Sequence, residues 1–351
     1  MDIYTISKEE SERINILKYI AIILVVFIHA YATEEIIMDG TDTFVLSQSL
    51  LLFENLISQT IARCGVPLFF FISSVLLFRK QRKYSETIFG KIRTLLVPYL
   101  IWNSLWVFIF ILLQNIDSCA SFFSGNNTPI LQRSLPEWLE LYGIGRNLPC
   151  PQNYPLWFLR DLMITVLFFP VIEIVSNRFP KQLLAGSVFL LLFPVEFPLK
   201  QAVLWLCLGA SIVKLQIHIT ALDGVSLWKL SLIYLLCTII TWITENTVID
   251  VLFIFLGMAY WVRVTKAIFD IPKYRALFLE LSEWTFMIYV AHELTLTSLK
   301  KICWKLLPTE PIFLLIEYIF LPVAVIAGCS IFGAVFKKCA PWMYSVSTGE
   351  R

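Results

Sequence analysis

The sequence predicts an all-α protein, a polytopic helix bundle that crosses a membrane about ten times. Hydrophobic residues make up 58% of the 351 residues and charged residues only 15%, and the mean hydropathy is +0.75. These values exclude an ordinary soluble domain, and the length suits one bundle of about ten spanning helices. The net charge of +2 gives no reason to expect a nucleic-acid partner. We therefore expect a single integral membrane domain over residues 1–351.

The expected membrane bundle rests on ten apolar runs, because each approaches the length that a helix needs to cross the apolar core of a bilayer. The fifth run is the weakest, since it is short and is followed by Pro194 and Pro198. The predicted spans lie near residues 14–32, 56–78, 94–114, 155–175, 182–195, 199–215, 227–245, 247–264, 277–299 and 311–336.

The distribution of basic residues predicts the orientation of the bundle. If the N-terminus is cytoplasmic, twenty lysines and arginines fall in inner segments and six in outer segments, while two lie within spans. Inner segments of membrane proteins carry the excess of positive charge. We therefore expect both the N-terminus and the C-terminus in the cytoplasm.

The longest predicted connection, residues 115–154, lies on the outer side and holds a possible surface helix around PEWLELYG. A loop of this length in a compact bundle more often serves as a lid or binding surface than as a spacer, although a poorly ordered spacer is the alternative. Cys119 and Cys150 lie in this loop and could pair if the outer compartment is oxidising. The eight cysteines show no metal-ligand spacing, so we expect no metal site.

The first span carries Lys18 near its start and His29 near its end. A helix turns about 100° and rises about 1.5 Å per residue, so eleven residues return to nearly the same face roughly 16 Å further on. A histidine inside a membrane span costs free energy unless water hydrates it or another group forms a hydrogen bond or ion pair with it. It is a functional candidate for that reason. The alternative is a histidine that only bonds to a neighbouring helix.

Further ionisable residues fall within the spans, and we expect them at a depth similar to that of His29, towards the outer side. Charges at one depth are typical of a polar cavity open to the outer face. Buried ion pairs, such as Arg160 with Glu293, are the structural alternative. The residues concerned are Arg63, Arg160, Asp161, His292, Glu293 and Glu317.

The densest basic cluster, from Arg79 to Arg93, lies on the predicted inner side and includes Lys91. There are two interpretations of this cluster. It either follows only from the orientation of the chain in the membrane, or it binds an anionic, phosphate-bearing ligand near Lys18. This basic cluster on the inner side and the acid–base cavity expected on the outer side are joined by one face of the first span. Together they would form a route across the membrane for a solute or for a chemical group.

Five blocks resemble, in the expected order, the acyltransferase-3 family of integral membrane acyltransferases. The blocks are LKYIAIILVVFIHA, RCGVPLFFFISSVLLF, KIRTLLVPYLIW, PLWFLRDLM and FMIYVAHE. Two positions depart from the family pattern: Lys18 stands where arginine is more common, and Ser74 where glycine is usual.

The resemblance implies an enzyme that takes an acyl group, commonly acetyl, from coenzyme A in the cytoplasm. It passes the group to a hydroxyl of a glycan or lipid-linked glycan at the outer face of the bacterial inner membrane. Acetyl and succinyl both remain open. Acyl-coenzyme A would be a co-substrate, with no bound cofactor. A transporter or flippase of a lipid-linked sugar or small solute is the alternative, although such proteins more typically show internal repeats and broken helices.

The resemblance also implies roles for individual residues. His29 would deprotonate the acceptor or relay the acyl group, with His292 and Glu293 as a second acid–base pair. The phosphates of the donor would bind Lys18, Lys91 and Arg93, and the acyl and acceptor site would be shaped by Arg63, Trp157, Arg160 and Asp161.

Overall fold

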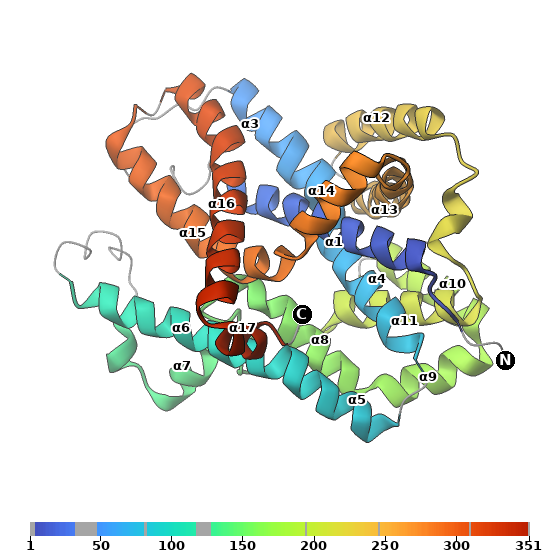
Figure 1. Ribbon diagram of the computed structural model, residues 1–351, viewed down its shortest axis with the longest axis horizontal. Helices are drawn as coiled ribbons and strands as arrows, with labels where there is room; N and C mark the ends of the chain where they lie inside the picture. Colours follow the sequence, from blue (N-terminus) through green and yellow to red (C-terminus); the bar gives the residue numbers. More distant parts are fainter. Residues whose placement is uncertain are drawn as a thin grey trace. The chain divides into compact units, whose positions relative to one another are not determined.

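The computed structural model describes residues 4–31, 48–80, 83–116, 128–193, 195–244, 246–308 and 310–349. All regular secondary structure in these ranges is helical (Figure 1). Among the described residues, five helices are long and apolar enough to cross a membrane: Lys8–Ala30, Ser49–Phe78, Tyr84–Gln114, Thr247–Asp270 and Pro311–Cys339. The all-helical membrane fold is thus confirmed, whereas the count of about ten spans and the cytoplasmic termini stay predictions.

The chain forms two compact units, residues 1–82 with 168–333, and residues 83–167 with 334–351. The helices of the first unit are α1 (Lys8–Ala30), α3 (Gln48–Glu54), the π-helix η1 (Asn55–Thr60), the 3-10 helix η2 (Ile61–Cys64), α4 (Gly65–Phe78), α9 (Phe169–Arg178), α10 (Pro180–Leu192), α11 (Lys200–Lys214), η7 (Ile219–Leu222), α12 (Leu227–Ile243), α13 (Thr247–Asp270), α14 (Pro272–Ser282), α15 (Thr285–Leu306) and most of α16 (Pro311–Cys339). Those of the second unit are α5 (Tyr84–Lys91), η3 (Ile92–Leu96), α6 (Val97–Gln114), η5 (Ile130–Gln132), α7 (Leu135–Glu140), η6 (Tyr154–Leu156), α8 (Trp157–Leu167) and α17 (Pro341–Thr348).

Helix α1 begins at a capping box and is anchored there by an ion pair. The Ser7 hydroxyl accepts the backbone N–H of Glu10, and the Glu10 carboxylate accepts the N–H of Ser7. Arg13 is fully buried and donates from both terminal nitrogens to Asp223, at 2.8 and 2.9 Å. Its Nε donates to the hydroxyl of Thr265. A buried guanidinium with a bidentate partner fixes this end of the helix.

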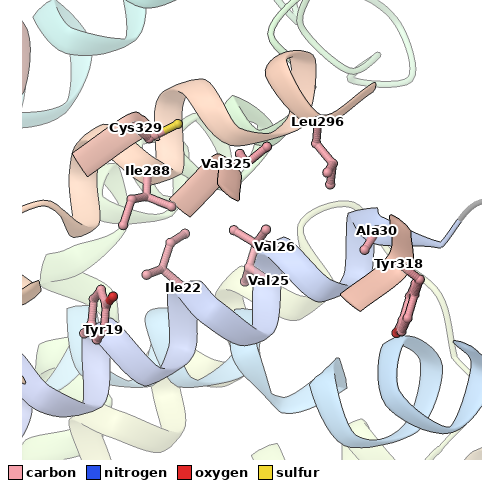
Figure 2. Close-up of a cluster of buried hydrophobic side chains, with 10 residues drawn as sticks. All are labelled: Tyr19, Ile22, Val25, Val26, Ala30, Ile288, Leu296, Tyr318, Val325 and Cys329. Atoms are coloured by element: carbon pink, nitrogen blue, oxygen red, sulfur yellow. The ribbon is translucent and has the colours of Figure 1, made fainter. Parts of the chain in front are cut away.

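The middle of α1 packs against α15 and α16 in the apolar core of the first unit. Figure 2 shows Ile22 and Val26 of α1 pointing towards Ile288 of α15 and Val325 of α16, all of them buried. Towards the end of the helix, Ala30 lies close to Tyr318 of α16 (Figure 2). This core orders the helix that carries Lys18 and His29.

Two predicted spans differ from the observed helices because each is interrupted. The span predicted at 277–299 is wrong as one helix: α14 ends at Ser282 and α15 begins at Thr285. The backbone N–H groups of Glu283 and Trp284 turn back to carbonyls three residues earlier, which tightens and ends the helix. The span predicted at 155–175 is likewise two helices, since α8 ends at Leu167 and α9 starts at Phe169 with a proline in its first turn.

Helices α4 and α11 pack closely around one serine–glycine contact. Ser74 of α4 is fully buried, and its hydroxyl donates to the Leu206 carbonyl at 2.6 Å. A Cβ added at Gly209 of α11 would lie only 2.5 Å from the Ser74 Cβ and Oγ. The serine that departs from the family pattern is therefore accommodated by a glycine on the facing helix.

We predict that Gly209→Ala destabilises the protein by about 1–3 kcal/mol, because the new methyl group overpacks this contact. The double variant Gly209→Ala with Ser74→Gly should recover most of that loss, since it removes the opposing side chain. Unfolding in detergent micelles measures both effects. Gly186→Ala is the matched control, because a Cβ there meets nothing within 4 Å. Equal stability of the Gly209→Ala and Gly186→Ala variants would contradict the packing argument.

Candidate functional site

His29 and His292 lie next to each other inside the first unit. Their ring centres are 5.3 Å apart and the rings are tilted by 57°. His292 is fully buried, and its Nδ1 lies 2.9 Å from the Ile288 carbonyl and 3.0 Å from the Tyr289 carbonyl. Because carbonyls only accept hydrogen bonds, Nδ1 carries the hydrogen, which leaves the lone pair on Nε2. That Nε2 is buried, and no group in the described part of the chain forms a hydrogen bond with it.

The C-terminal end of α1, which carries His29, is capped by side chains from other segments. The Ser58 hydroxyl of η1 donates to the Phe27 carbonyl at 2.6 Å. The Lys300 ammonium of α15 is buried, with 2% of its surface exposed, and donates to the carbonyls of His29 and Tyr31 at 3.2 Å each. The last carbonyls of a helix have no partner within the helix, so cations and hydroxyls stabilise its end. These contacts fix the position of the His29 backbone.

Lys18 and Arg63 also belong to the first unit. Lys18 lies on the same continuous helix as His29 and donates to the Asn15 side-chain oxygen at 3.2 Å. Arg63 is exposed in η2 and donates to Gln59 at 3.3 Å. This hydrogen bond runs along its own segment, and the acceptor-site role of Arg63 stays a prediction.

Glu293 follows His292 on α15 and accepts a hydrogen bond from the Thr297 hydroxyl at 3.2 Å. It is partly buried. The helix thus presents an imidazole and a carboxylate on adjacent positions. Its acid–base role stays a prediction.

Five of the predicted site residues lie in the second unit. Lys91 ends α5 and Arg93 lies in the π-helix η3, so both belong to one continuous helical stretch, Tyr84–Gln114. Trp157 is the first residue of α8, with Arg160 and Asp161 one turn later.

Arg160 and Asp161 organise the loop that precedes α8. Arg160 donates to Asp161 from Nε at 2.9 Å, and the same carboxylate lies 2.8 Å from its Nη2. Its Nη1 donates to the carbonyls of Gly143, Leu148 and Pro149. Gly143 has a positive φ of 67°, and a Cβ there would lie 2.9 Å from the guanidinium, so the turn requires glycine. The predicted alternative partner of Arg160 was Glu293; the observed carboxylate is that of Asp161.

Residues 128–154, the later part of the long connection predicted on the outer side, are held by several hydrogen bonds. Asn103 of α6 donates to the Leu141 carbonyl and accepts the N–H of Asn153, while the Tyr99 hydroxyl donates to the Tyr142 carbonyl. The expected surface helix is α7. These contacts argue against a poorly ordered spacer over this part. Cys119 lies outside the described residues, so its pairing with Cys150 stays a prediction.

Ser134 is the N-cap of helix α7, and its hydroxyl and backbone N–H both donate to the Glu137 carboxylate, at 2.6 and 2.7 Å. These hydrogen bonds, that of the hydroxyl first, lower the pKa of Glu137. The capping box therefore keeps this exposed carboxylate ionised at the start of the helix.

Sequence reasoning missed Lys300 and Ser58. Lys300 lies buried against the end of α1, a contact that the sequence analysis does not predict. Its spacing carried a usable signal, because His292, Leu296 and Lys300 recur every four residues and so share one face of α15. Ser58 gave no such signal.

We predict that Arg160→Lys loosens the loop over residues 141–149, because lysine cannot replace the planar fork that reaches three carbonyls and Asp161 at once. Hydrogen exchange of the backbone amides should become about tenfold faster or more in this stretch. Arg146→Lys, an exposed position in the same loop, is the matched control. Unchanged protection in the Arg160→Lys variant would show that the guanidinium does not hold the loop.

A comparison with curated proteins finds one relative, the succinoglycan biosynthesis protein ExoH of Rhizobium meliloti (strain 1021). It is 27% identical to the chain over 192 residues, which are 53% of this chain and 48% of the relative. The aligned part thus spans about half the length of the curated relative. No solved structure matches the chain.

The sequence profile of one protein family, described as an acyltransferase domain, matches residues 11–334. This range covers nearly the whole chain and includes every predicted site residue. The resemblance in the five sequence blocks is therefore confirmed. The chain carries an acyltransferase domain and belongs to the acyltransferase-3 family.

Proposed function

We propose that the protein is a membrane acyltransferase that moves an acyl group from acyl-coenzyme A to a hydroxyl of a cell-surface or exported glycan. The observation that carries the proposal is the contact of His29 with the fully buried His292 at the capped end of α1, in a chain of this family. The name of the relative, a succinoglycan biosynthesis protein, supports a glycan as the acceptor. Acetyl is the acyl group that we favour.

In this proposal His29 is the general base. It takes the proton of the acceptor hydroxyl while that oxygen attacks the thioester carbonyl, and the bond from carbon to sulfur breaks. The coenzyme A thiolate leaves and takes up a proton, so an ester and a free thiol are formed. A positioned imidazole suits this task because it exchanges protons near neutral pH.

His292 orients His29 in the proposed reaction. Its Nδ1 hydrogen is held by the carbonyls of Ile288 and Tyr289, so only Nε2 can accept a hydrogen bond. This Nε2 has no hydrogen-bond partner among the described residues. In the proposed reacting complex an N–H of His29 donates to it, which leaves the other His29 nitrogen with its lone pair towards the acceptor. This arrangement fixes the tautomer of the base, as the orienting partner of a catalytic histidine does. Glu293 is the proposed further acid–base group beside it.

The donor is proposed to enter from the cytoplasm. Lys18 lies eleven residues before His29 on one continuous helix, roughly 16 Å away along its axis. A lysine there can bind a phosphate of coenzyme A as a point charge. The extended pantetheine arm then brings the thioester towards His29.

The topology completes the proposal. The proposed bundle has about ten spans, on the evidence of the apolar runs, and both termini in the cytoplasm, on the evidence of the excess of basic residues in the predicted inner segments. The glycan acceptor then approaches from the outer side of the inner membrane. The acyl group, rather than the whole coenzyme, crosses.

We predict that His29→Ala lowers acyl transfer by about 10²–10⁴-fold, because it removes the general base. A strain that lacks the gene, complemented with this variant, should show surface glycans without the O-acyl mass that the unmodified gene restores. Protein abundance in the membrane should stay near normal.

The matched control is His218→Gln, which changes a histidine that pairs with Glu10 near the start of α1. This control should retain transfer. A His29→Ala variant that restores the O-acyl mass in full would refute His29 as the base.

A further inference from the structure

The helical stretch of the second unit that carries Lys91 and Arg93 contains a π-helical turn. Helices α5, η3 and α6 follow one another without a break over Tyr84–Gln114. Within this stretch the backbone N–H of Val97 donates to the carbonyl of Ile92, five residues earlier instead of four. A π-turn of this kind holds one residue more than an α-helical turn and occurs frequently at functional sites. Because each residue turns the chain by about 100°, the π-turn changes the direction of the Lys91 side chain relative to α6 by about that angle.

Pro98 gives a local reason for a distortion at this place. It is the second residue of α6, and because η3 leads into α6 without a break, it lies inside a helix. A proline there has no N–H to give to the carbonyl of Thr94, four residues earlier, and its ring crowds that carbonyl. A helix can accommodate a proline through a kink or through a π-turn. Further contacts must therefore select the π-turn.

Helix α17 supplies such contacts, because it packs directly against the π-turn. Gly349 caps the end of α17 with a positive φ of 69°. A Cβ at this glycine would lie only 2.7 Å from the Thr94 Cα and 2.8 Å from the Thr94 carbonyl oxygen, so the contact requires glycine. Trp102 of α6 donates from Nε1 to the Ser347 carbonyl at 2.9 Å, and Ser347 and Thr348 are buried. Helix α17 is therefore fastened beside α6, with its end on the π-turn (Figure 1).

We propose that α17 positions the binding site of the donor. Its contact with Thr94 holds the π-turn, and the π-turn directs Lys91 and the exposed Arg93 towards the phosphates of acyl-coenzyme A. The inference rests on the proposed acyl transfer, in which these two basic residues bind the donor. The family profile matches residues 11–334, and α17 lies outside that range, so this role does not follow from the family.

The first test measures acetyl transfer in inside-out membrane vesicles of the complemented strain, whose own glycans serve as acceptor. Gly349→Ala should raise the KM for acetyl-coenzyme A about tenfold and leave kcat nearly unchanged, the effect expected on losing a hydrogen bond from a cation to a phosphate. Trp102→Phe removes the hydrogen bond to α17 without added bulk and should raise the same KM. Gly328→Ala of α16 is the matched control, since a Cβ there meets nothing within 4 Å. An unchanged KM in both variants, or a loss of kcat alone, overturns the proposal.

The second test follows the π-turn without the reaction. Spin labels are placed at the exposed positions of Phe89 in α5 and Phe108 in α6, in the full chain with its eight native cysteines replaced, and the protein is studied in nanodiscs. Gly349→Ala should change the distance between the labels by several ångströms, because loss of the extra residue from the turn rotates α5 by about 100° relative to α6. Gly328→Ala should leave this distance unchanged.

An unchanged label distance in the Gly349→Ala variant shows that α17 does not hold the π-turn and overturns the proposal. The two tests also separate this inference from the proposed function. If the label distance changes but vesicles with the unmodified protein transfer no acetyl group, α17 holds the π-turn and the proposed transfer function fails instead.

Discussion

The site depends on the hydrogen bonds that other segments donate to the last backbone carbonyls of α1, inside an apolar bundle. The last carbonyls of a helix lack partners within it, and hydrocarbon supplies none, so other segments must provide them. Here Ser58 and Lys300 do so, while the bidentate Arg13–Asp223 pair fixes the opposite end. A helix held at both ends keeps Lys18 and His29 at a defined separation.

The same contacts join the segments that surround His29. The capping lysine brings a buried positive charge next to His29, and the hydroxyl chain from Tyr318 through Ser58 joins α16 to the carbonyl of Phe27. The proposed base therefore lies at a helix end that side chains of η1 and α15 cap. His292 completes the arrangement because its own helix fixes its Nδ1 hydrogen. In the second unit, Arg160 holds a loop in a similar way, because its guanidinium donates hydrogen bonds to backbone carbonyls of that loop.

Much of this could be predicted from the sequence, because it depends on local pattern. The all-helical membrane fold follows from hydropathy, the spacing of Lys18 and His29 from helix geometry, and the family from five ordered blocks. The break at Glu283 and Trp284 was not predictable from hydropathy, since hydroxyl and backbone contacts end α14 within an apolar run. The burial of Lys300 against α1 was not predicted, because the number of charges in a segment does not show which face of a helix a side chain occupies. Arg160 was predicted as a site residue, but its observed partners lie in a loop whose path the sequence does not specify.

Sealed right-side-out vesicles that contain the protein and a glycan acceptor test the central claim most directly. Acetyl-coenzyme A labelled in the acetyl group is trapped in the lumen, which corresponds to the cytoplasm, and an external glycan is recovered after incubation. The account predicts that the label appears as an ester on the external glycan while the coenzyme stays in the lumen. Label that remains on coenzyme A, or that reaches the glycan only when both substrates are on one side, would contradict acyl transfer across the membrane.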